Sequence, residues 1–324
     1  MLNQFELKKL ILPEIKNRIL RILFKPLIAF FKAARLKSDL YHFHDPELIP
    51  VGVLLKIFGR KVVYDVHEDV SQQILHKEWI PGLIRKPLSD IFNKFEKFFA
   101  SFFDGIITAT PHILDKFSKV SYKEKKVCIN NYPIVRKLEK NHIKKDWVLY
   151  IGGITKERSA LEMVQSFNIK NHELILIGSI YPKELLKKMK REKNWKNVEY
   201  LQSIYGNEKF DYFHESKIGL CLLKPTKNYV DSLPVKILEY WERGLPVLAS
   251  NFSYWKGFYG TYGGIDFVDP TSPDEIKNKL AQMLKNPNNL LEMGKKGREA
   301  VEKYLNWDAE FKKLLKFYDS ILSK

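Results

Sequence analysis

Short apolar runs alternate with longer segments of helical periodicity along most of the chain. The runs are rich in β-branched and aromatic residues, whereas the segments between them repeat apolar residues every three or four positions. This alternation is typical of an α/β protein in which crossover helices join the strands of parallel sheets. The predicted strands are Asp39 to His44, Lys61 to His67, Gly105 to Thr110, Lys126 to Asn130, Trp147 to Gly153, His172 to Gly178, Val198 to Gln202, Ile218 to Lys224, Pro246 to Ser250 and Ile265 to Asp269.

The strand pattern stops between Asn131 and Asp146, where Pro133 and a charged run without apolar periodicity indicate a linker. The chain has 324 residues, which is long enough for two domains that each bury a core. We therefore predict a basic amphipathic helical segment at 1–38, an N-terminal Rossmann-like domain at 39–140, a C-terminal one at 141–306, and at 307–324 a helix that packs back on the N-terminal domain.

The opening segment is strongly basic. Its apolar residues could cover the sheet, which we expect for Ala29 to Lys37, or could lie on an anionic membrane surface, which we expect for the earlier part. Basic residues interrupt its longest apolar stretch, Ile19 to Phe31, which is too short to span a bilayer. We expect no transmembrane helix and no signal peptide. The basic residues are Lys8, Lys9, Lys16, Arg18, Arg21, Lys25, Lys32, Arg35 and Lys37.

The whole chain is basic as well, with 55 Lys and Arg against 38 Asp and Glu, a net charge of +17. Such a charge favours polyanionic partners, namely nucleic acid, anionic lipid or phosphorylated substrates. No nucleic-acid motif is evident, and the aromatic residues follow the apolar periodicity, so we expect no nucleic-acid partner. The two cysteines, Cys128 and Cys221, lie in apolar runs, which predicts buried free thiols and a cytoplasmic location.

Candidate chemistry is expected at the carboxyl ends of the strands, where α/β sheets bind ligands. The strand from Trp147 ends in Gly152 and Gly153, and Lys156 and Arg158 follow at the start of a predicted helix. Glycines permit close approach of the backbone, and basic side chains beside a helix N-terminus favour an anion. A glycine-rich turn with solvated basic residues is the alternative.

A second candidate lies at Asp231 and Glu239, eight positions apart across the start of a predicted helix. Pro234 suits the first helical turn, which places the start of this helix near Ser232. Asp231 would then lie just before the helix and Glu239 two turns along it.

Six ordered segments between about Leu40 and Asp308 resemble bacterial glycosyltransferases of family 4. They read HFHDPELIPVG, KVVYDVHED, DGIITATPHI, NNYP, YIGGITKER and SLPVKILEYWERGLPVLASNF. The resemblance implies a GT-B fold of two Rossmann-like domains and sugar transfer, with retention of configuration, from a nucleotide-diphosphate-sugar. It also implies a polysaccharide, oligosaccharide or lipid-linked acceptor, used in the cytoplasm or at the inner face of the membrane.

The resemblance also implies roles for individual residues. Glu239 would bind the ribose of the donor, and Asp231 would lie beside the donor sugar. Backbone N–H groups of Ser232 and Leu233 would hold the diphosphate with Arg158. His67, at the end of the second predicted strand, would face the donor sugar.

One departure from the family concerns the phosphate contacts. Many relatives have an arginine where this chain has Gly153. The loss of that phosphate contact implies a larger role in phosphate binding for Arg158 and for Lys156 or Lys236. We expect no metal and no other cofactor, because basic groups can act in place of a cation. The nearest candidate for a metal site, His42 and His44 in HFHDPE, lacks further ligands at suitable spacing.

Family members also open with a strand and a glycine loop that this sequence lacks, so the N-terminal domain is predicted to be truncated. Three alternatives stay open. The chain is an active enzyme, the donor-binding part of a split transferase completed by a partner chain, or an inactive nucleotide-binding copy.

Overall fold

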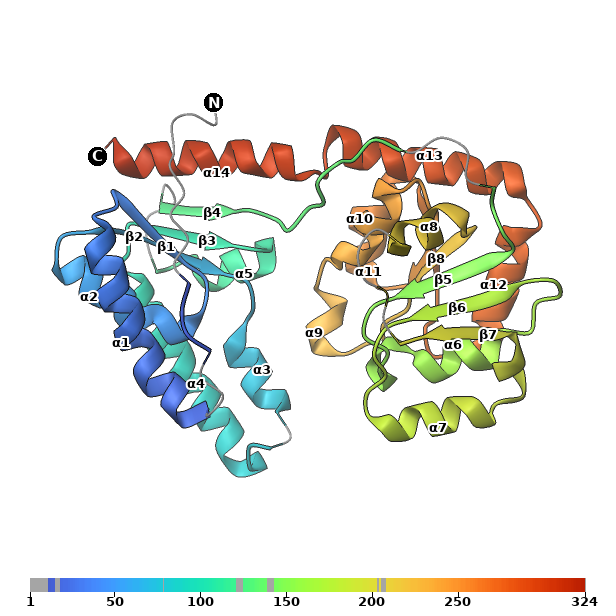
Figure 1. Ribbon diagram of the computed structural model, residues 1–324, viewed down its shortest axis with the longest axis horizontal. Helices are drawn as coiled ribbons and strands as arrows, with labels where there is room; N and C mark the ends of the chain where they lie inside the picture. The colour runs from blue at the N-terminus through green and yellow to red at the C-terminus, as the bar shows by residue number, and fades with distance from the viewer. Residues whose placement is uncertain are drawn as a thin grey trace. The chain divides into compact units, whose positions relative to one another are not determined.

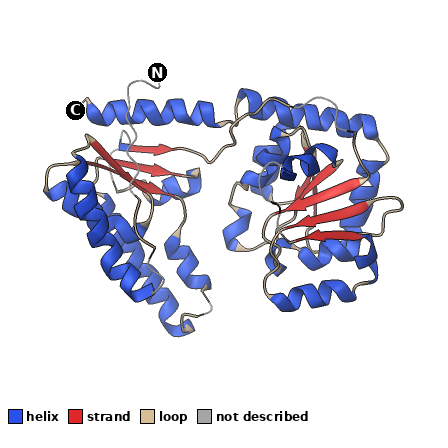
Figure 2. Ribbon diagram, viewed as in Figure 1, coloured by secondary structure: helices blue, strands red, loops and turns tan. Residues whose placement is uncertain are grey.

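A computed structural model describes residues 11–14, 18–77, 79–120, 125–138, 143–202, 204 and 208–323. The chain divides into two compact units. Unit 1 comprises Met1–Asn130 and Glu310–Lys324, and unit 2 comprises Asn131–Ala309. Each unit contains one parallel sheet with helices against it, so the predicted α/β class is confirmed (Figure 2). The early basic residues Lys8, Lys9 and Lys16 lie outside the described residues.

Unit 1 contains a four-stranded sheet in the order β1-β2-β3-β4 (Figure 1). All three strand pairs are parallel. The strands are β1 (Leu40–Phe43), β2 (Lys61–Val66), β3 (Gly105–Thr108) and β4 (Lys126–Cys128). The helices are α1 (Arg18–Leu36), the 3₁₀ turn η2 (Pro46–Leu48), α2 (Ile49–Ile57), α3 (Val70–His76), α4 (Gly82–Ala100) and α5 (Pro111–Lys116).

The core of unit 1 joins the sheet to α1 and α2. Ala29 and Ala33 of α1 are buried in the same apolar cluster as the strand residues Val62 and Tyr64. This part of α1 therefore covers the sheet, as expected for the segment from Ala29. Burial of this apolar surface is the main term that stabilises the unit.

The last helix, α14 (Trp307–Leu322), continues from Glu310 onward within unit 1. Phe317 and Ile321 lie so close to Gly105 that a Cβ there would be within 2.8 Å of both side chains. The Nζ of Lys61 donates a hydrogen bond to the carbonyl oxygen of Ile321 at 2.7 Å. The helix is thus bound to β2 and β3 by both packing and hydrogen bonding.

Unit 2 contains a six-stranded parallel sheet in the order β10-β9-β8-β5-β6-β7. Counted from its first strand this is the doubly wound order 3-2-1-4-5-6, whose ligand crevice opens where the order reverses, here between β5 and β8. The strands are β5 (Trp147–Ile151), β6 (Glu173–Ile177), β7 (Val198–Leu201), β8 (Ile218–Cys221), β9 (Val247–Ser250) and β10 (Ile265–Val268).

The helices of unit 2 lie on both faces of this sheet (Figure 1). They are η4 (Lys156–Arg158), α6 (Ala160–Ser166), α7 (Lys183–Arg191), η5 (Lys193–Asn197), α8 (Glu208–Glu215), α9 (Lys227–Val230), α10 (Val235–Glu242), α11 (Ser253–Tyr259), η6 (Gly260–Tyr262), α12 (Pro273–Leu284) and α13 (Pro287–Lys303). None of the helices in the described part of the chain is long and apolar enough to cross a membrane.

Two buried aromatic residues fix the position of α10. The hydroxyl of Tyr240 donates to backbone carbonyl oxygens of β5 and β8, and its ring contacts Gly219, where a Cβ would be 2.7 Å away. The indole of Trp241 donates to the carbonyl oxygen of Gly264 at 2.8 Å. Because both side chains are fully buried, the face that α10 presents to the crevice is set by packing.

The start of α10 differs from the prediction. The helix begins at Val235, with Pro234 as an extended N-cap residue, three residues later than expected. The preceding segment is held as a turn, because Ser232 donates its N–H to the carbonyl oxygen of Tyr229 at 3.1 Å. The indole of Trp255 donates to the carbonyl oxygen of Ser232 at 2.7 Å. Both cysteines are free; Cys221 is buried, and Cys128, against expectation, only half-buried.

Candidate active site

A glycine loop follows β5 at the reversal point of the unit 2 sheet. Gly152 has a φ of +132°, a conformation that side chains rarely adopt, and a Cβ there would lie 2.5 Å from the Nζ of Lys236. Gly178, after β6, has a φ of +140°, and a Cβ there would collide with the carbonyl oxygen of Gly152. Both positions therefore require glycine for this loop to form.

Two cationic side chains meet at this loop. The Nη1 of Arg158 donates to the carbonyl oxygen of Gly153 at 3.2 Å. The Nζ of Lys236 lies 4.3 Å from the centre of the Tyr150 ring, and the Tyr150 hydroxyl donates to the same Gly153 oxygen at 2.6 Å. Arg158 and Lys236 come from segments far apart in the sequence, and together they place two cationic groups beside Gly152.

The charge of Lys236 is held in an unfavourable environment. Burial lowers the pKa of its ammonium group to about 8, and the nearby charge of Arg158 acts in the same direction. An anion bound at the loop would relieve this cost, so the site favours a ligand that carries negative charge. The third basic candidate, Lys156, is exposed in η4.

The other predicted residues of unit 2 lie around α10. Asp231 is exposed at the end of α9, and Leu233 is half-buried against the core. The N–H of Ser232 is engaged with Tyr229, so it does not serve as the expected phosphate donor in this conformation. The N–H groups of Val235 and Lys236, which precede the first helical hydrogen bond of α10, are better placed to do so, whereas the N–H of Ile237 donates to the carbonyl oxygen of Pro234 at 3.2 Å.

Glu239 is exposed on α10 and lines a hollow of about 290 Å³ in unit 2. The other wall of the hollow includes Phe210, whose ring lies 4.0 Å from the guanidinium carbon of Arg243. A larger hollow, about 700 Å³, lies near Trp147 and Glu173 at the amino ends of β5 and β6. Because ligands of such sheets bind at the carboxyl ends, we take the hollow beside Glu239 as part of the site.

His67 follows β2 in unit 1 and is 37% exposed. Its Nε2 lies 3.2 Å from an oxygen of Asp65, and this hydrogen bond raises the pKa of His67 against the effect of burial. Burial would raise the pKa of the Asp65 carboxyl, but hydrogen bonds from His42, His44 and His67 keep it well below its ordinary value.

Sequence reasoning did not single out Asp65. The signal was present, because residues two apart on a strand share a face, which pairs Asp65 with His67 and His42 with His44. Pairing of Phe43 with Tyr64 in the β1–β2 register then brings the two pairs together.

Comparisons with known proteins address the family. Residues 158–316 match the family described as Glycosyl transferase-like. No curated protein matches the sequence. Among solved structures, sucrose-phosphate synthase from Thermosynechococcus elongatus is similar, with a TM-score of 0.73 at 18% identity, over 95% of this chain and 81% of that one.

Two further structures share the fold. HepE from Anabaena, in complex with UDP, has a TM-score of 0.71 at 13% identity, over 92% of this chain and 83% of that one. TarM from S. aureus, in a complex that includes UDP, has a TM-score of 0.67 at 15% identity, over 91% of this chain and 59% of that one. The family match over residues 158–316 and the two parallel sheets, in a GT-B-like fold, identify the C-terminal part of the chain as glycosyl transferase-like.

Proposed function

We propose that this chain transfers a sugar from a nucleotide-diphosphate-sugar to an acceptor hydroxyl, with its donor diphosphate at the Gly152–Gly153 loop. The observation that carries the proposal is the convergence of Arg158 and Lys236 at this loop. A diphosphate supplies the negative charge that this pair of cations favours.

The same groups suit the chemistry of transfer. As the bond from the anomeric carbon to the diphosphate breaks, negative charge builds up on the leaving phosphate oxygens. Arg158, Lys236 and the open N–H groups of α10 would stabilise that charge more strongly than the ground state. The acceptor hydroxyl attacks the anomeric carbon from the same face and passes its proton to the leaving phosphate oxygen, and this preserves configuration.

We propose three further contacts for the donor. Glu239 would accept hydrogen bonds from the ribose hydroxyls, since its exposed carboxylate lines the hollow beside α10. Asp231 and His67 would contact the sugar, as the family resemblance implies. Because HepE and TarM are both seen with UDP, we propose that the donor is a UDP-sugar.

Substitution of Arg158 tests the diphosphate site. Arg158→Ala should lower kcat about 100-fold, because the loss of one donor to developing charge has this size of effect. Lys156→Ala, which removes an exposed cation from the same turn, is the matched control and should change kcat little.

Glu239→Ala should instead raise the Kd for UDP in calorimetry.

Equal turnover for Arg158→Ala and the unchanged protein would remove Arg158 from the mechanism, and an unchanged UDP affinity for Glu239→Ala would remove Glu239 from the ribose site. UDP binding without sugar transfer in the unchanged protein would favour the alternative in which this chain is the donor-binding part of a transferase completed by a partner chain.

We also propose that the acceptor is carried on a membrane lipid. An apolar stripe runs along α4 and into the turn that follows it. Its members are exposed side chains at helical spacing, namely Ile84, Leu88, Ile91, Phe95, Phe98 and Phe102. The exposed Lys86 and Lys94 lie on the same helix. Apolar and cationic side chains on one helix fit the interface of an anionic bilayer, as vesicle co-sedimentation would test.

A further inference from the structure

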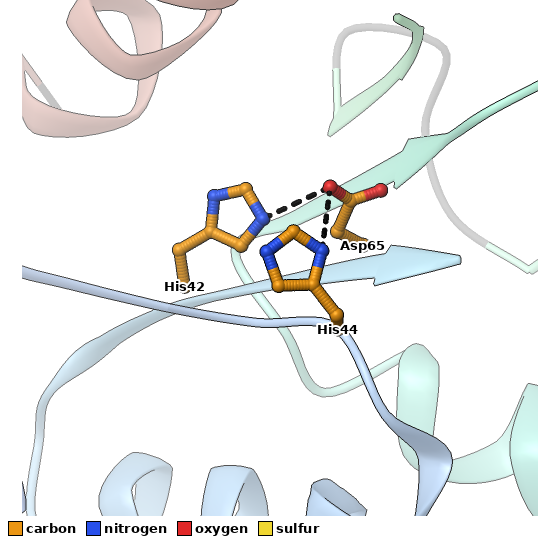
Figure 3. Close-up of side chains that lie close together, drawn as sticks. All are labelled: His42, His44 and Asp65. Carbon is orange, nitrogen blue, oxygen red and sulfur yellow. Dashed lines mark hydrogen bonds and ion pairs between the residues drawn. The ribbon is translucent and has the colours of Figure 1, made fainter. Parts of the chain in front are cut away.

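Three histidine rings surround one carboxylate oxygen at the carboxyl ends of β1 and β2. The Nε2 of His42 and the Nδ1 of His44 each lie 3.1 Å from the Oδ2 of Asp65. Figure 3 shows both rings directed toward this oxygen. The Nε2 of His67 lies 3.2 Å from the same oxygen and 2.9 Å from the Nδ1 of His44. All of these residues belong to unit 1.

Protons alone do not satisfy these four contacts. Each contact needs one proton between its two atoms, and a ring nitrogen carries at most one. If all three nitrogens are protonated, His44 and His67 bring two N–H groups against each other. If one of this pair is not protonated, its lone pair faces the carboxylate oxygen. One contact is therefore unfavourable in every protonation state.

A cation resolves the conflict, because the Nδ1 of His44 can then offer it a lone pair while the Nε2–H of His67 donates to the carboxylate. We propose that His42, His44 and Asp65 form a binding site for a divalent transition metal, zinc in particular. Two imidazole nitrogens and one carboxylate oxygen, with a fourth position for water, are a donor set typical of zinc. This ligand set leaves His67 to its proposed sugar contact, so the site is independent of the transfer reaction.

The distances suit zinc coordination. Ligand atoms about 2.0–2.1 Å from zinc stand about 3.3–3.4 Å apart in a tetrahedron. The Nε2 of His42 and the Nδ1 of His44 each lie 3.1 Å from the Oδ2 of Asp65, within a few tenths of an ångström of this arrangement. The ligand atoms offered by His42, His44 and Asp65 all lie within 4.8 Å of one another. His44, with a side chain 58% exposed, leaves an entry path from solvent.

A residue outside the ligand set orients one of the rings. The Nδ1 of His42 lies 2.5 Å from the hydroxyl of Tyr318 in α14. When Nδ1–H donates to this hydroxyl, the lone pair of Nε2 points to the ion. Metal-bound histidines usually hold their second ring nitrogen in this way. Tyr318 is therefore a positioning residue for the site.

The proposal departs from the sequence-based expectation of no metal, which found no ligand cluster and had only His42 and His44, two ligands on one strand, as a candidate. The parallel pairing of β1 with β2 adds Asp65, which is more than 20 positions away in the sequence.

Zinc titration of the full chain, without nucleotide, tests the site. Calorimetry should show one equivalent bound, and Co²⁺ in place of zinc should give the visible absorption of a four-coordinate ion. His44→Ala and Asp65→Asn should each weaken zinc binding more than about 100-fold, and Tyr318→Phe about 10- to 100-fold. His112→Ala, which removes an exposed histidine elsewhere in unit 1, should leave binding unchanged.

The proposal is overturned if the unchanged chain binds no stoichiometric zinc, or if His44→Ala binds it as tightly as His112→Ala. Circular dichroism of His44→Ala guards against misfolding, which is not expected for so exposed a residue. UDP affinity, measured in parallel, reports on unit 2 and separates failure of this site from failure of the donor site.

Discussion

At the scale of single residues, Lys236 brings a buried ammonium group to the glycine loop. In the sequence it is one of two lysines that could support Arg158. The structure brings its Nζ to the space beside Gly152, while Lys156 is exposed. Burial lowers its pKa to about 8, so its charge is lost about two and a half pH units below the pKa of 10.5 of an ordinary lysine.

This shift predicts a pH dependence of nucleotide binding. A bound diphosphate favours the ammonium form, so the affinity for UDP should be constant below pH 8 and fall by up to about tenfold per pH unit above it. Calorimetry on both sides of pH 8 measures this change. Lys236→Arg, which keeps its charge, is the control and should show a much flatter profile.

Identical profiles for Lys236→Arg and the unchanged protein would show that another group titrates. The same shift also affects folding, with a definite sign. The unfolded chain binds the proton more tightly, so the desolvation cost is constant below pH 8 and is relieved as the pH rises toward 10.5.

At the scale of elements, α10 connects the donor site to the core of unit 2. Its buried end carries Glu242, which binds Arg243 at 2.7 Å and accepts the N–H of Arg136 at 2.8 Å. Arg298 of α13 donates to the carbonyl oxygens of Glu242 and Arg136. This network connects the segment at Arg136, near the start of unit 2, to α10 and α13.

Glu242→Ala should therefore destabilise unit 2 by about 3–5 kcal/mol, because it leaves the buried guanidinium group of Arg243 without its carboxylate. Hydrogen exchange of the strands of unit 2 measures this loss without assuming that both units unfold together. Glu299→Ala removes one side of an exposed ion pair on α13 and should cost no more than about 0.5 kcal/mol. Equal losses in both variants would contradict the structural role of Glu242.

At the scale of the whole molecule, the net charge and the exposed apolar surface both fit the proposed binding to an anionic membrane. The net charge of +17 attracts anionic surfaces in general. The apolar stripe of α4 adds a requirement that charge alone does not, namely a partner that can take up phenylalanine and isoleucine side chains.

The membrane proposal predicts binding to anionic vesicles that exceeds binding to zwitterionic ones and weakens with salt. The double variant Ile91→Ser/Phe98→Ser should lower the partition coefficient about tenfold or more, since both side chains are exposed and available for insertion. Leu291→Ser, at an equally exposed leucine of α13 in unit 2, is the control and should bind as the unchanged protein does. Equal losses for both variants would show that α4 has no particular role.

The sequence by itself determined the α/β class, the ten strands and their division into sets of four and six, because the period of apolar residues reflects the side of each element that is buried. It also located the glycine loop and Arg158, because strand ends and glycines are local signals. The start of α10 was misplaced by three residues, since hydrogen bonds from Trp255 and within the turn at Tyr229 decide where that helix begins.

Only the tertiary structure decided which side chains meet. Lys236 reaches Gly152 because Tyr240 and Trp241 fix the rotation of α10 against the sheet. The three candidate metal ligands meet because β1 and β2 pair in parallel and in register. Such contacts join residues far apart in sequence, and they depend on packing and register, which no local pattern of residues encodes.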